Sequence, residues 1–231
     1  MNYVFAPPPL VSAPVDGGAE RFPVHRIYCV GSNYRDHARE MGRTGREPPV
    51  FFMKPADALL PVPAGETGVM AYPSLTHNLH HEVELVVAIG TGGRDIGAAD
   101  ALGHVFGYAV GLDMTRRDLQ AQMKKLSAPW CIGKGFEQSA PLGPITPRAQ
   151  AGAIEAGEIA LRLNGVERQR SAVSQMIWSV PEIIAHLSAA WTLAPGDLIF
   201  TGTPAGVGPV ERGELLEASC SGLEPLRVRV S

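Results

Sequence analysis

The segment Val83–Ile89 constrains the fold more than any other part of the sequence. Its apolar and largely β-branched residues predict a core strand. Because side chains alternate across a strand, Glu82 and Glu84 lie together on one face. Two carboxylates about 7 Å apart repel each other, and burying either one unpaired costs several kcal/mol. The pattern alone favours an edge strand whose acidic face meets water, but a divalent cation would also remove both problems.

Strand and turn signals dominate the rest of the chain. The sequence has 26 Gly and 20 Pro among 231 residues, which favours many turns and short strands over a helical bundle. Because the predicted strands do not alternate regularly with helices, we expect an α+β fold that is β-rich, mixed and mostly antiparallel, not a doubly wound sheet. Apolar runs predict further strands over Val24–Val30, Val105–Gly111, Glu158–Leu163, Asp197–Phe200, Glu214–Ala218 and Leu226–Val230.

Helical patterns cover three segments, and two polar residues are candidates to cap them. Asn33 and Thr115 stand at the starts of the first and second segments, where side-chain oxygens accept hydrogen bonds from unpaired N–H groups. Pro181 should break or restart the third. Gly42–Pro49 combines charge, Gly and Pro, which predicts a mobile loop beside the first helix. The three segments are Asn33–Met41, Thr115–Leu126 and Val173–Trp191.

Length and charge limit the classes of protein that fit. A single core can grow to roughly 250 residues before a chain divides, so we expect one domain over 23–231 behind an irregular arm over 1–22. The net charge is −3 and no Lys/Arg block exceeds a pair, which argues against nucleic-acid and membrane-surface partners. No apolar run approaches the roughly 20 residues of a membrane span.

Three cysteines, Cys29, Cys131 and Cys220, lie far apart in the sequence. No CxxC pair indicates zinc or redox chemistry, so free thiols are expected. The N-terminal segment lacks the basic residues and continuous apolar stretch of a signal peptide. The sequence therefore predicts a protein of the reducing cytoplasm.

A third acidic residue strengthens the metal hypothesis. Asp113 follows an apolar run at the point where a strand should end, although a helix N-cap is its ordinary role. Three carboxylates without a thiolate, Glu82, Glu84 and Asp113, suit Mg²⁺ or Mn²⁺. Nearby histidines at 77, 80 and 81 raise zinc as an alternative. They form no HExxH motif, so zinc ranks below magnesium.

His37 and Glu40 form a second candidate pair. They are three residues apart on a predicted helix and are therefore neighbours. A carboxylate beside an imidazole fixes its tautomer and raises its basicity, as in a water-activating base. On spacing alone an exposed pair worth a few tenths of a kcal/mol fits better. The pair is a candidate catalytic dyad only because other candidate site residues occur in the same sequence.

Two glycine-rich segments complete the candidates. Lys134 lies between two glycines, where it is either an exposed loop lysine or a cation that holds an oxyanion. The turn Thr201–Gly208 lacks the GK[ST] of a phosphate-binding loop and the spacing of a dinucleotide fingerprint. It is either a plain turn or a cradle in which backbone N–H groups and the Thr203 hydroxyl bind an anion.

Taken in order, these motifs resemble the fumarylacetoacetate hydrolase family, and among its members the bacterial enzymes that cleave fumarylpyruvate in gentisate breakdown. The resemblance covers about residues 24–230. The acidic pair with Asp113 and the TGTPAGVG turn are its most specific parts. The matching stretches are Val30–Glu40, Phe51–Pro55, His80–Val87, Gly111–Gln120, Lys134, Trp178–Ile184 and Pro195–Gly208.

The resemblance implies a role for each matching residue. It implies a β-rich mixed-sheet roll with a lid helix, assembled as a homodimer. Glu82, Glu84 and Asp113 match metal ligands, with Mg²⁺ or Mn²⁺ as the cofactor. The other matches are a water-activating dyad (His37, Glu40), oxyanion donors (Lys134, Gln120) and contacts to a small oxo-acid substrate (Arg117, Thr203, Lys54).

The implied activity is hydrolysis of a carbon–carbon bond in an acylpyruvate, such as fumarylpyruvate to fumarate and pyruvate. Oxaloacetate decarboxylation or isomerisation of an oxo-diacid would use the same metal without an attacking water. A non-catalytic metal-binding or acid-binding module is a third possibility, but simple binding needs no base. The acyl tail of the substrate, the choice between Mg²⁺ and Mn²⁺, and any contribution of a partner subunit to the site stay open.

Overall fold

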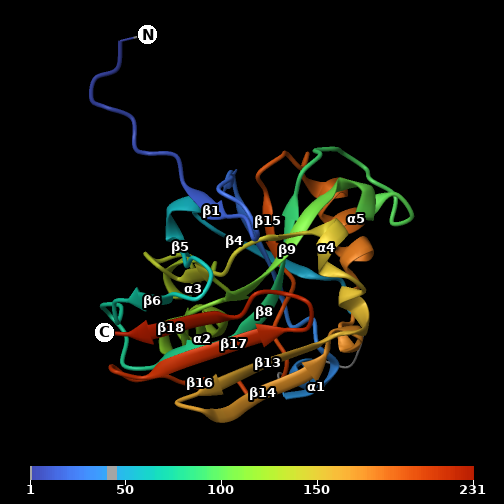
Figure 1. Cartoon of the computed structure of the whole chain (residues 1–231). Helices are drawn as coiled ribbons and strands as arrows, with labels where there is room; N and C mark the ends of the chain where they lie inside the picture. Colours follow the sequence, from blue (N-terminus) through green and yellow to red (C-terminus); the bar gives the residue numbers. More distant parts are fainter. Residues whose placement is uncertain (1, 41–45) are drawn as a thin grey trace.

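Two packed sheets organise the computed structural model, which describes residues 2–40 and 46–231 but not the side chains of residues 38–40. Figure 1 shows the five-stranded sheet in front of β8 and β9. Its order is β14-β13-β17-β18-β6. The strands are β6 (Thr67–Met70), β13 (Glu158–Leu163), β14 (Val166–Ala172), β17 (Leu215–Cys220) and β18 (Leu226–Val230).

The larger sheet is eight-stranded and mixed, as the sequence predicts. Its order is β4-β3-β15-β8-β9-β11-β5, with β12 paired to β9. The pairs β3–β15 and β5–β11 are parallel, whereas β8 is antiparallel to both neighbours. The strands are β3 (Ile27–Gly31), β4 (Val50–Lys54), β5 (Leu59–Pro61), β8 (Val83–Ile89), β9 (Val105–Leu112), β11 (Ala140–Leu142), β12 (Thr146–Pro147) and β15 (Leu198–Phe200).

Strand β8 is an interior strand with a core on each face. Val83 and Leu85 pack into the cluster shared with β13 and β17, and Val86 packs into a second cluster behind the sheet. Every residue of β8 is buried. The edge-strand interpretation is therefore wrong, because β15 and β9 occupy both edges of β8 and Glu84 is only 1% exposed.

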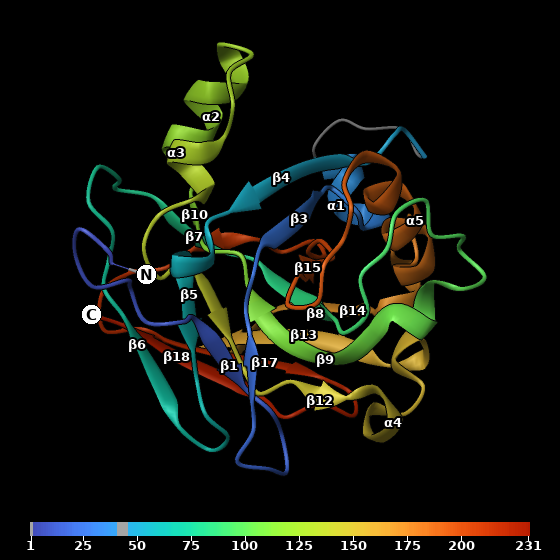
Figure 2. The same ribbon diagram turned by 90° about the horizontal axis from the view of Figure 1, so that it is seen from above.

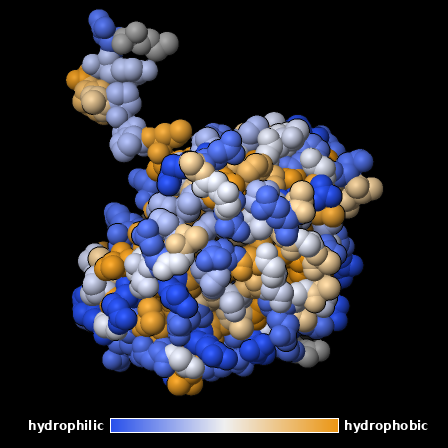
Figure 3. Space-filling model, in the orientation of Figure 1, coloured by the Kyte–Doolittle hydropathy of each residue, from blue (hydrophilic) through white to orange (hydrophobic). Residues whose placement is uncertain are grey.

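Two smaller sheets complete the fold, one next to Glu82 and one near the N-terminus of the chain. One comprises β7 (Leu79–His81), β10 (Thr115–Arg116) and β16 (Gly208–Pro209), and another comprises β1 (Ser12–Pro14) and β2 (Arg21–Pro23). The predicted irregular arm over 1–22 is wrong for its second half, because Ala13 and Phe22 are buried in the second core cluster and residues 12–23 form this hairpin. Residues before them extend away from the body as an arm (Figures 1 and 3).

The helices are short, and all three predicted helices start later in the chain than expected. They are α1 (Arg35–Glu40), α2 (Arg117–Lys125), α3 (Cys131–Lys134), α4 (Arg148–Ala151) and α5 (Val180–Ala190). Thr115 does not cap α2, because it belongs to β10 and its hydroxyl bonds the Asp113 carbonyl. Asn33 bonds Trp178 and Thr201 through its amide, which joins α1 to two other segments.

Pro181 lies in the first turn of α5, so the helical segment from Val173 is interrupted and restarts near this proline, as predicted. Val173–Gln175 is a separate 3₁₀ turn, and α5 starts after the Ser179 N-cap. The Glu182 carboxylate accepts from the Ser179 N–H at 2.9 Å and from its hydroxyl at 2.7 Å. Proline suits the first helical turn, where its missing N–H costs no bond.

Figure 2 shows α2 and α3 standing out from the body above β7 and β10. Gly133 permits their close contact, because a Cβ there would meet the Gln120 backbone nitrogen at 2.9 Å. None of the helices in the described ranges is both long and apolar enough to span a bilayer. The predicted loop Gly42–Pro49 lies partly outside the described residues, which resume at Arg46.

Candidate active site

The antiparallel pair β8–β9 brings the three predicted metal ligands together. Glu82 precedes β8, Glu84 lies within it, and Asp113 follows β9. The pairing of Glu84 with Gly111 places the end of β9 beside the start of β8, and the Asp113 N–H donates to the Glu82 carbonyl at 2.9 Å. One oxygen from each carboxylate lies within 4.8 Å of the others, and all three residues are buried.

Three cations surround these carboxylates. Lys134 Nζ lies 2.7 Å from Glu82 Oε2 and 2.6 Å from Asp113 Oδ2, so the exposed-loop interpretation of this lysine is wrong. Arg117 pairs with the other oxygen of Glu82. Lys54 Nζ lies 2.8 Å from Asp113 Oδ1. Each lysine is almost completely buried, at 1% and 2% exposure for Lys54 and Lys134.

Lys54 has protein partners, whereas the resemblance implies a substrate contact. Its ammonium donates to the carbonyls of Met114, at 3.2 Å, and Lys134 in addition to pairing with Asp113. Two of its three N–H donors bond these carbonyls, and Asp113 Oδ1 has an ion pair with Lys54 but no hydrogen-bond partner among the described residues. Lys54 is absent from the described lining of the cavity above the carboxylates. In this structure Lys54 therefore supports Asp113, and its contact with substrate stays a prediction.

The charges are distributed unequally among the carboxylates. Burial alone would raise the pKa of Glu82, but the charges of Lys134 and Arg117 hold it below its usual value. Burial, followed by the charges of Asp113 and Glu82, raises the pKa of Glu84 well above its ordinary range. Glu84 accepts a hydrogen bond from the Gly202 N–H, a neutral group, at 2.7 Å.

The donor set fits a divalent cation. Three buried oxygen ligands that converge within 4.8 Å match the hard-ligand preference of Mg²⁺ and Mn²⁺. A cation would also offset the charge of Glu84, which neither lysine reaches in the hydrogen bonds described. The cluster contains no histidine among the described residues, so the zinc alternative has no support there.

The histidines near Glu82 have other surroundings. Burial, then the charge of Arg117, lowers the pKa of His80 to about 4, and the Arg117 Nε–H points toward its Nδ1 at 3.4 Å. His81 is buried and lies 2.9 Å from Gln169 Oε1 through Nδ1. Burial also lowers the pKa of His81. Both imidazoles are therefore favoured in the neutral state.

Five of the predicted residues line one cavity with the carboxylates: His37, Arg117, Gln120, Lys134 and Thr203. His37, on α1, is only 7% exposed, so the exposed-pair interpretation is wrong for the imidazole. Glu40 lies at the end of α1, but its side chain is outside the described ones.

Gln120 has a defined amide orientation. Arg117 Nη1 donates to Gln120 Oε1 at 2.6 Å, and a guanidinium cannot accept a hydrogen bond. The oxygen therefore faces Arg117, and the Gln120 NH₂ group is directed elsewhere as a donor. Gln120 is 4% exposed and lines the cavity, which places this donor close to the carboxylates.

Sequence reasoning missed Gln169. It is the buried residue in an otherwise largely exposed stretch of β14, and it contacts Thr203, Pro204, His81 and Val83. No local motif marks it, because its partners come from segments 34 or more residues away.

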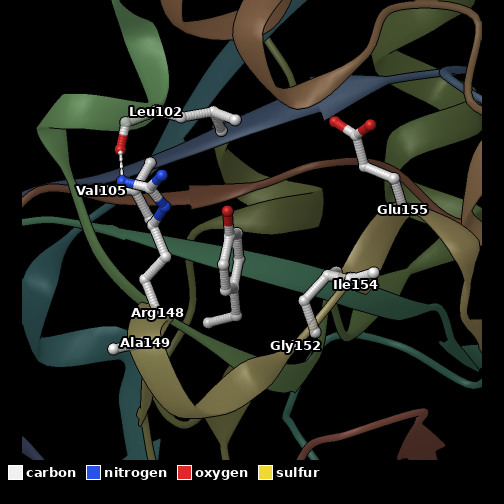
Figure 4. Close-up of a pocket in the computed structure, with 9 residues that line it drawn as sticks. Leu102, Val105, Arg148, Ala149, Gly152, Ile154 and Glu155 are labelled. Carbon is white, nitrogen blue, oxygen red and sulfur yellow. Dashed lines mark hydrogen bonds between the residues drawn. The ribbon is translucent and has the colours of Figure 1, made fainter.

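A second pocket lies at the opposite end of β9 (Figure 4). It is lined by Val105 at the start of that strand and by residues of the 148–155 segment. Arg148 donates to the Leu102 carbonyl at 2.7 Å, and Glu155 is the acidic residue of the lining. Without converging carboxylates, it lacks the features of the cavity at Asp113.

Fold and site together define an enzyme class in which hydrolases and isomerases share one β-rich scaffold. The family model for the C-terminal part of fumarylacetoacetate hydrolase matches residues 26–231. The chain belongs to the fumarylacetoacetate hydrolase family.

Three relatives illustrate the range of this family. A crystal structure of fumarylpyruvate hydrolase from Pseudomonas aeruginosa with Mn²⁺ and pyruvate is 56% identical, with a TM-score of 0.97 over 99% of both chains. The mitochondrial oxaloacetate tautomerase FAHD1 of Mus musculus is 43% identical over 88% of this chain and 90% of its own. The 5-carboxymethyl-2-hydroxymuconate delta-isomerase of Mycobacterium smegmatis is 34% identical, with a TM-score of 0.79 over 91% of this chain and 80% of its own.

Proposed function

We propose that the protein hydrolyses a carbon–carbon bond in a small acylpyruvate, with fumarylpyruvate, cleaved to fumarate and pyruvate, as the first candidate. One observation carries the proposal: the buried His37 imidazole lines the same cavity as Glu82, Glu84 and Asp113. Hydrolysis requires a base near the bound oxo acid that takes a proton from the attacking water. The similarity to a fumarylpyruvate hydrolase at 56% identity supports the same reaction.

Glu82, Glu84 and Asp113 are the residues that would hold Mg²⁺ or Mn²⁺. When bound, such an ion polarises the 2-oxo group and stabilises negative charge in the pyruvate part of the substrate. Lys54 and Lys134 keep Asp113 in position through both of its oxygens. The Gly202 N–H does the same for Glu84.

The protein side chains supply the proton transfers. His37 takes a proton from water, whose oxygen bonds to the distal acyl carbon, and Glu40 fixes the tautomer of the imidazole. The carbon–carbon bond then breaks, its electron pair passes to the pyruvate fragment as an enolate, and a proton returns to that carbon. The products are a carboxylic acid and pyruvate.

Lys134 and Gln120 are the donors proposed for the oxyanion formed by this attack. Two of the three Lys134 N–H groups bond Glu82 and Asp113, which leaves the third for the cavity. The Gln120 amide presents its NH₂ group because Arg117 occupies its oxygen. One such donor contributes roughly 3–4 kcal/mol to transition-state stabilisation. Arg117 and Thr203 are proposed to contact the substrate carboxylate.

Oxaloacetate tautomerisation is the second candidate, favoured by the 43% identity to the mouse enzyme of that name. It needs proton transfer between carbon and oxygen but no cleavage. Purified protein with Mn²⁺ or Mg²⁺ should be offered a panel of acylpyruvates and oxaloacetate, following loss of enol absorbance and formation of pyruvate. Pyruvate released from fumarylpyruvate supports hydrolysis. Rapid oxaloacetate interconversion without cleavage of any acylpyruvate would promote the tautomerase.

The proposal extends to the setting of the reaction. The resemblance to fumarylpyruvate hydrolases supports a role in the cytoplasmic breakdown of gentisate, and the family resemblance supports a homodimer. Light scattering on the purified protein measures the oligomeric state directly.

A further inference from the structure

Gln169 connects the five-stranded sheet to the cavity. The turn after β15 packs so closely on β14 that a Cβ at Gly206 would meet the Arg168 carbonyl oxygen at 2.1 Å. This contact places Gln169, which is 1% exposed, beside Thr203 and Pro204. Its amide nitrogen lies 2.8 Å from Thr203 Oγ1 and 2.9 Å from the Pro204 carbonyl oxygen.

The orientation of the Gln169 amide follows from two backbone groups. The Val83 N–H can only donate, and it faces Gln169 Oε1 at 3.1 Å. The Pro204 carbonyl can only accept, and it faces Gln169 Nε2. A flipped amide would place donor against donor and acceptor against acceptor. His81 Nδ1, 2.9 Å from Oε1, must then carry a proton that it donates to Gln169.

The same logic sets the direction of the Thr203 hydroxyl. Because the Gln169 NH₂ group can only donate, Thr203 Oγ1 accepts from it, and the Thr203 proton must point elsewhere. Thr203 is 2% exposed and lines the cavity with Glu82 and Glu84. A hydroxyl with a fixed acceptor side presents its donor side to a ligand.

We propose that Gln169 is a positioning residue that makes Thr203 an obligatory hydrogen-bond donor to the carboxylate or carbonyl oxygen of the bound oxo acid. The inference rests on the proposed function for the class of ligand, but not on the cleavage step. Gln169 itself does not touch the ligand. It selects ligands that offer an acceptor at this position, because a donor there would face the Thr203 proton.

A double-mutant cycle tests the proposal with pyruvate as the probe. The dissociation constant of pyruvate is measured calorimetrically in the presence of Mn²⁺ for wild type, Thr203→Val, Gln169→Met and the double variant. Thr203→Val removes a hydrogen bond to a charged ligand and should weaken binding roughly tenfold or more. Gln169→Met lets the hydroxyl rotate and should weaken binding about threefold to tenfold. The double variant should bind no more weakly than Thr203→Val alone.

Multiplicative losses in the double variant would overturn the proposal, because a general structural role of Gln169 would persist without the hydroxyl. Gln169→Glu provides a second test if the Met variant fails to fold. A carboxylate keeps the acceptor for Val83 and His81, but it accepts the Thr203 proton and should weaken pyruvate binding as much as Thr203→Val. A folded Gln169→Glu protein with wild-type affinity would also contradict the inference.

The exposed Gln175→Met variant is the matched control and should bind pyruvate like wild type. Hydrolysis is measured separately on the same proteins. Coupled pyruvate binding without cleavage of any acylpyruvate would overturn the proposed reaction and leave the role of Gln169 standing. Cleavage of an acylpyruvate, together with independent effects of the two substitutions on pyruvate binding, would overturn the role of Gln169 and leave the proposed reaction standing.

Discussion

The Gly202 N–H donates a 2.7 Å hydrogen bond to Glu84 Oε2, and this bond joins the turn after β15 to the middle of the carboxylate cluster. Gly202 has a φ of +101°, a conformation that L side chains rarely adopt. A Cβ there would meet Asn33 Cβ at 2.7 Å. Asn33 in turn holds the Thr201 carbonyl, so backbone geometry at one glycine positions both Glu84 and the segment leading to α1.

Gly202→Ala should therefore lower both stability and metal affinity. Backbone strain of this kind costs about 1–3 kcal/mol, and the clash with Asn33 adds to it. Gly213→Ala is the control, because Gly213 has a φ of +86° but open space around its Cβ position. Urea unfolding and Mn²⁺ titration should show that only Gly202→Ala weakens Mn²⁺ binding. Equal behaviour of the two variants would remove Gly202 from the site.

Glu84→Gln should weaken Mn²⁺ and Mg²⁺ binding without loss of stability in the metal-free protein. The amide oxygen of the glutamine can still accept a hydrogen bond from the Gly202 N–H. The substitution also removes a buried carboxylate, whose pKa is raised by burial and by its acidic neighbours, so the metal-free protein loses no favourable interaction. EDTA should abolish activity of the wild-type enzyme, and either ion should restore it. Full activity after EDTA treatment and dialysis would contradict the metal site.

Lys54→Met distinguishes a structural lysine from a substrate contact. Breaking a buried ion pair costs about 3–5 kcal/mol, and Lys54 also donates to two backbone carbonyls. The variant should unfold at markedly lower urea and bind Mn²⁺ more weakly, because Asp113 loses a partner. If only KM for the acylpyruvate changed and stability stayed at the wild-type value, the substrate-contact role would be supported.

His37→Ala should lower fumarylpyruvate hydrolysis by roughly 10²–10⁴, the usual contribution of a general base. Glu40→Gln should lower the rate of hydrolysis by a similar factor. The rate of the double variant should be only slightly lower than that of either single variant, because the two residues act as a unit. Mn²⁺-dependent pyruvate binding is the control and should persist, since Glu82, Glu84 and Asp113 are unchanged. Wild-type rates in both single variants would remove the dyad from the mechanism.

Local patterns determined several elements closely. The apolar run over Val83–Ile89 is a strand with the predicted bounds because it is buried on both faces, and Leu226–Val230 is a strand with the predicted bounds whose buried and exposed residues alternate. Helix starts were less predictable. Pro181 suits either a break or a first turn, and only the Ser179–Glu182 capping interaction decides for the first turn.

By itself, the sequence marked the three carboxylates as candidate metal ligands, since unpaired carboxylates beside buried strands need a cation or water wherever they lie. The tertiary structure decided which of them meet. The antiparallel pairing of β8 with β9 brings Glu84 and Asp113 close together. The packing of β14 against the turn after β15 places Gln169 beside Thr203. The tertiary structure also buries the Lys54 side chain next to the Asp113 carboxylate. Such contacts join residues far apart in the chain, so their geometry depends on how sheets pack and leaves no local pattern.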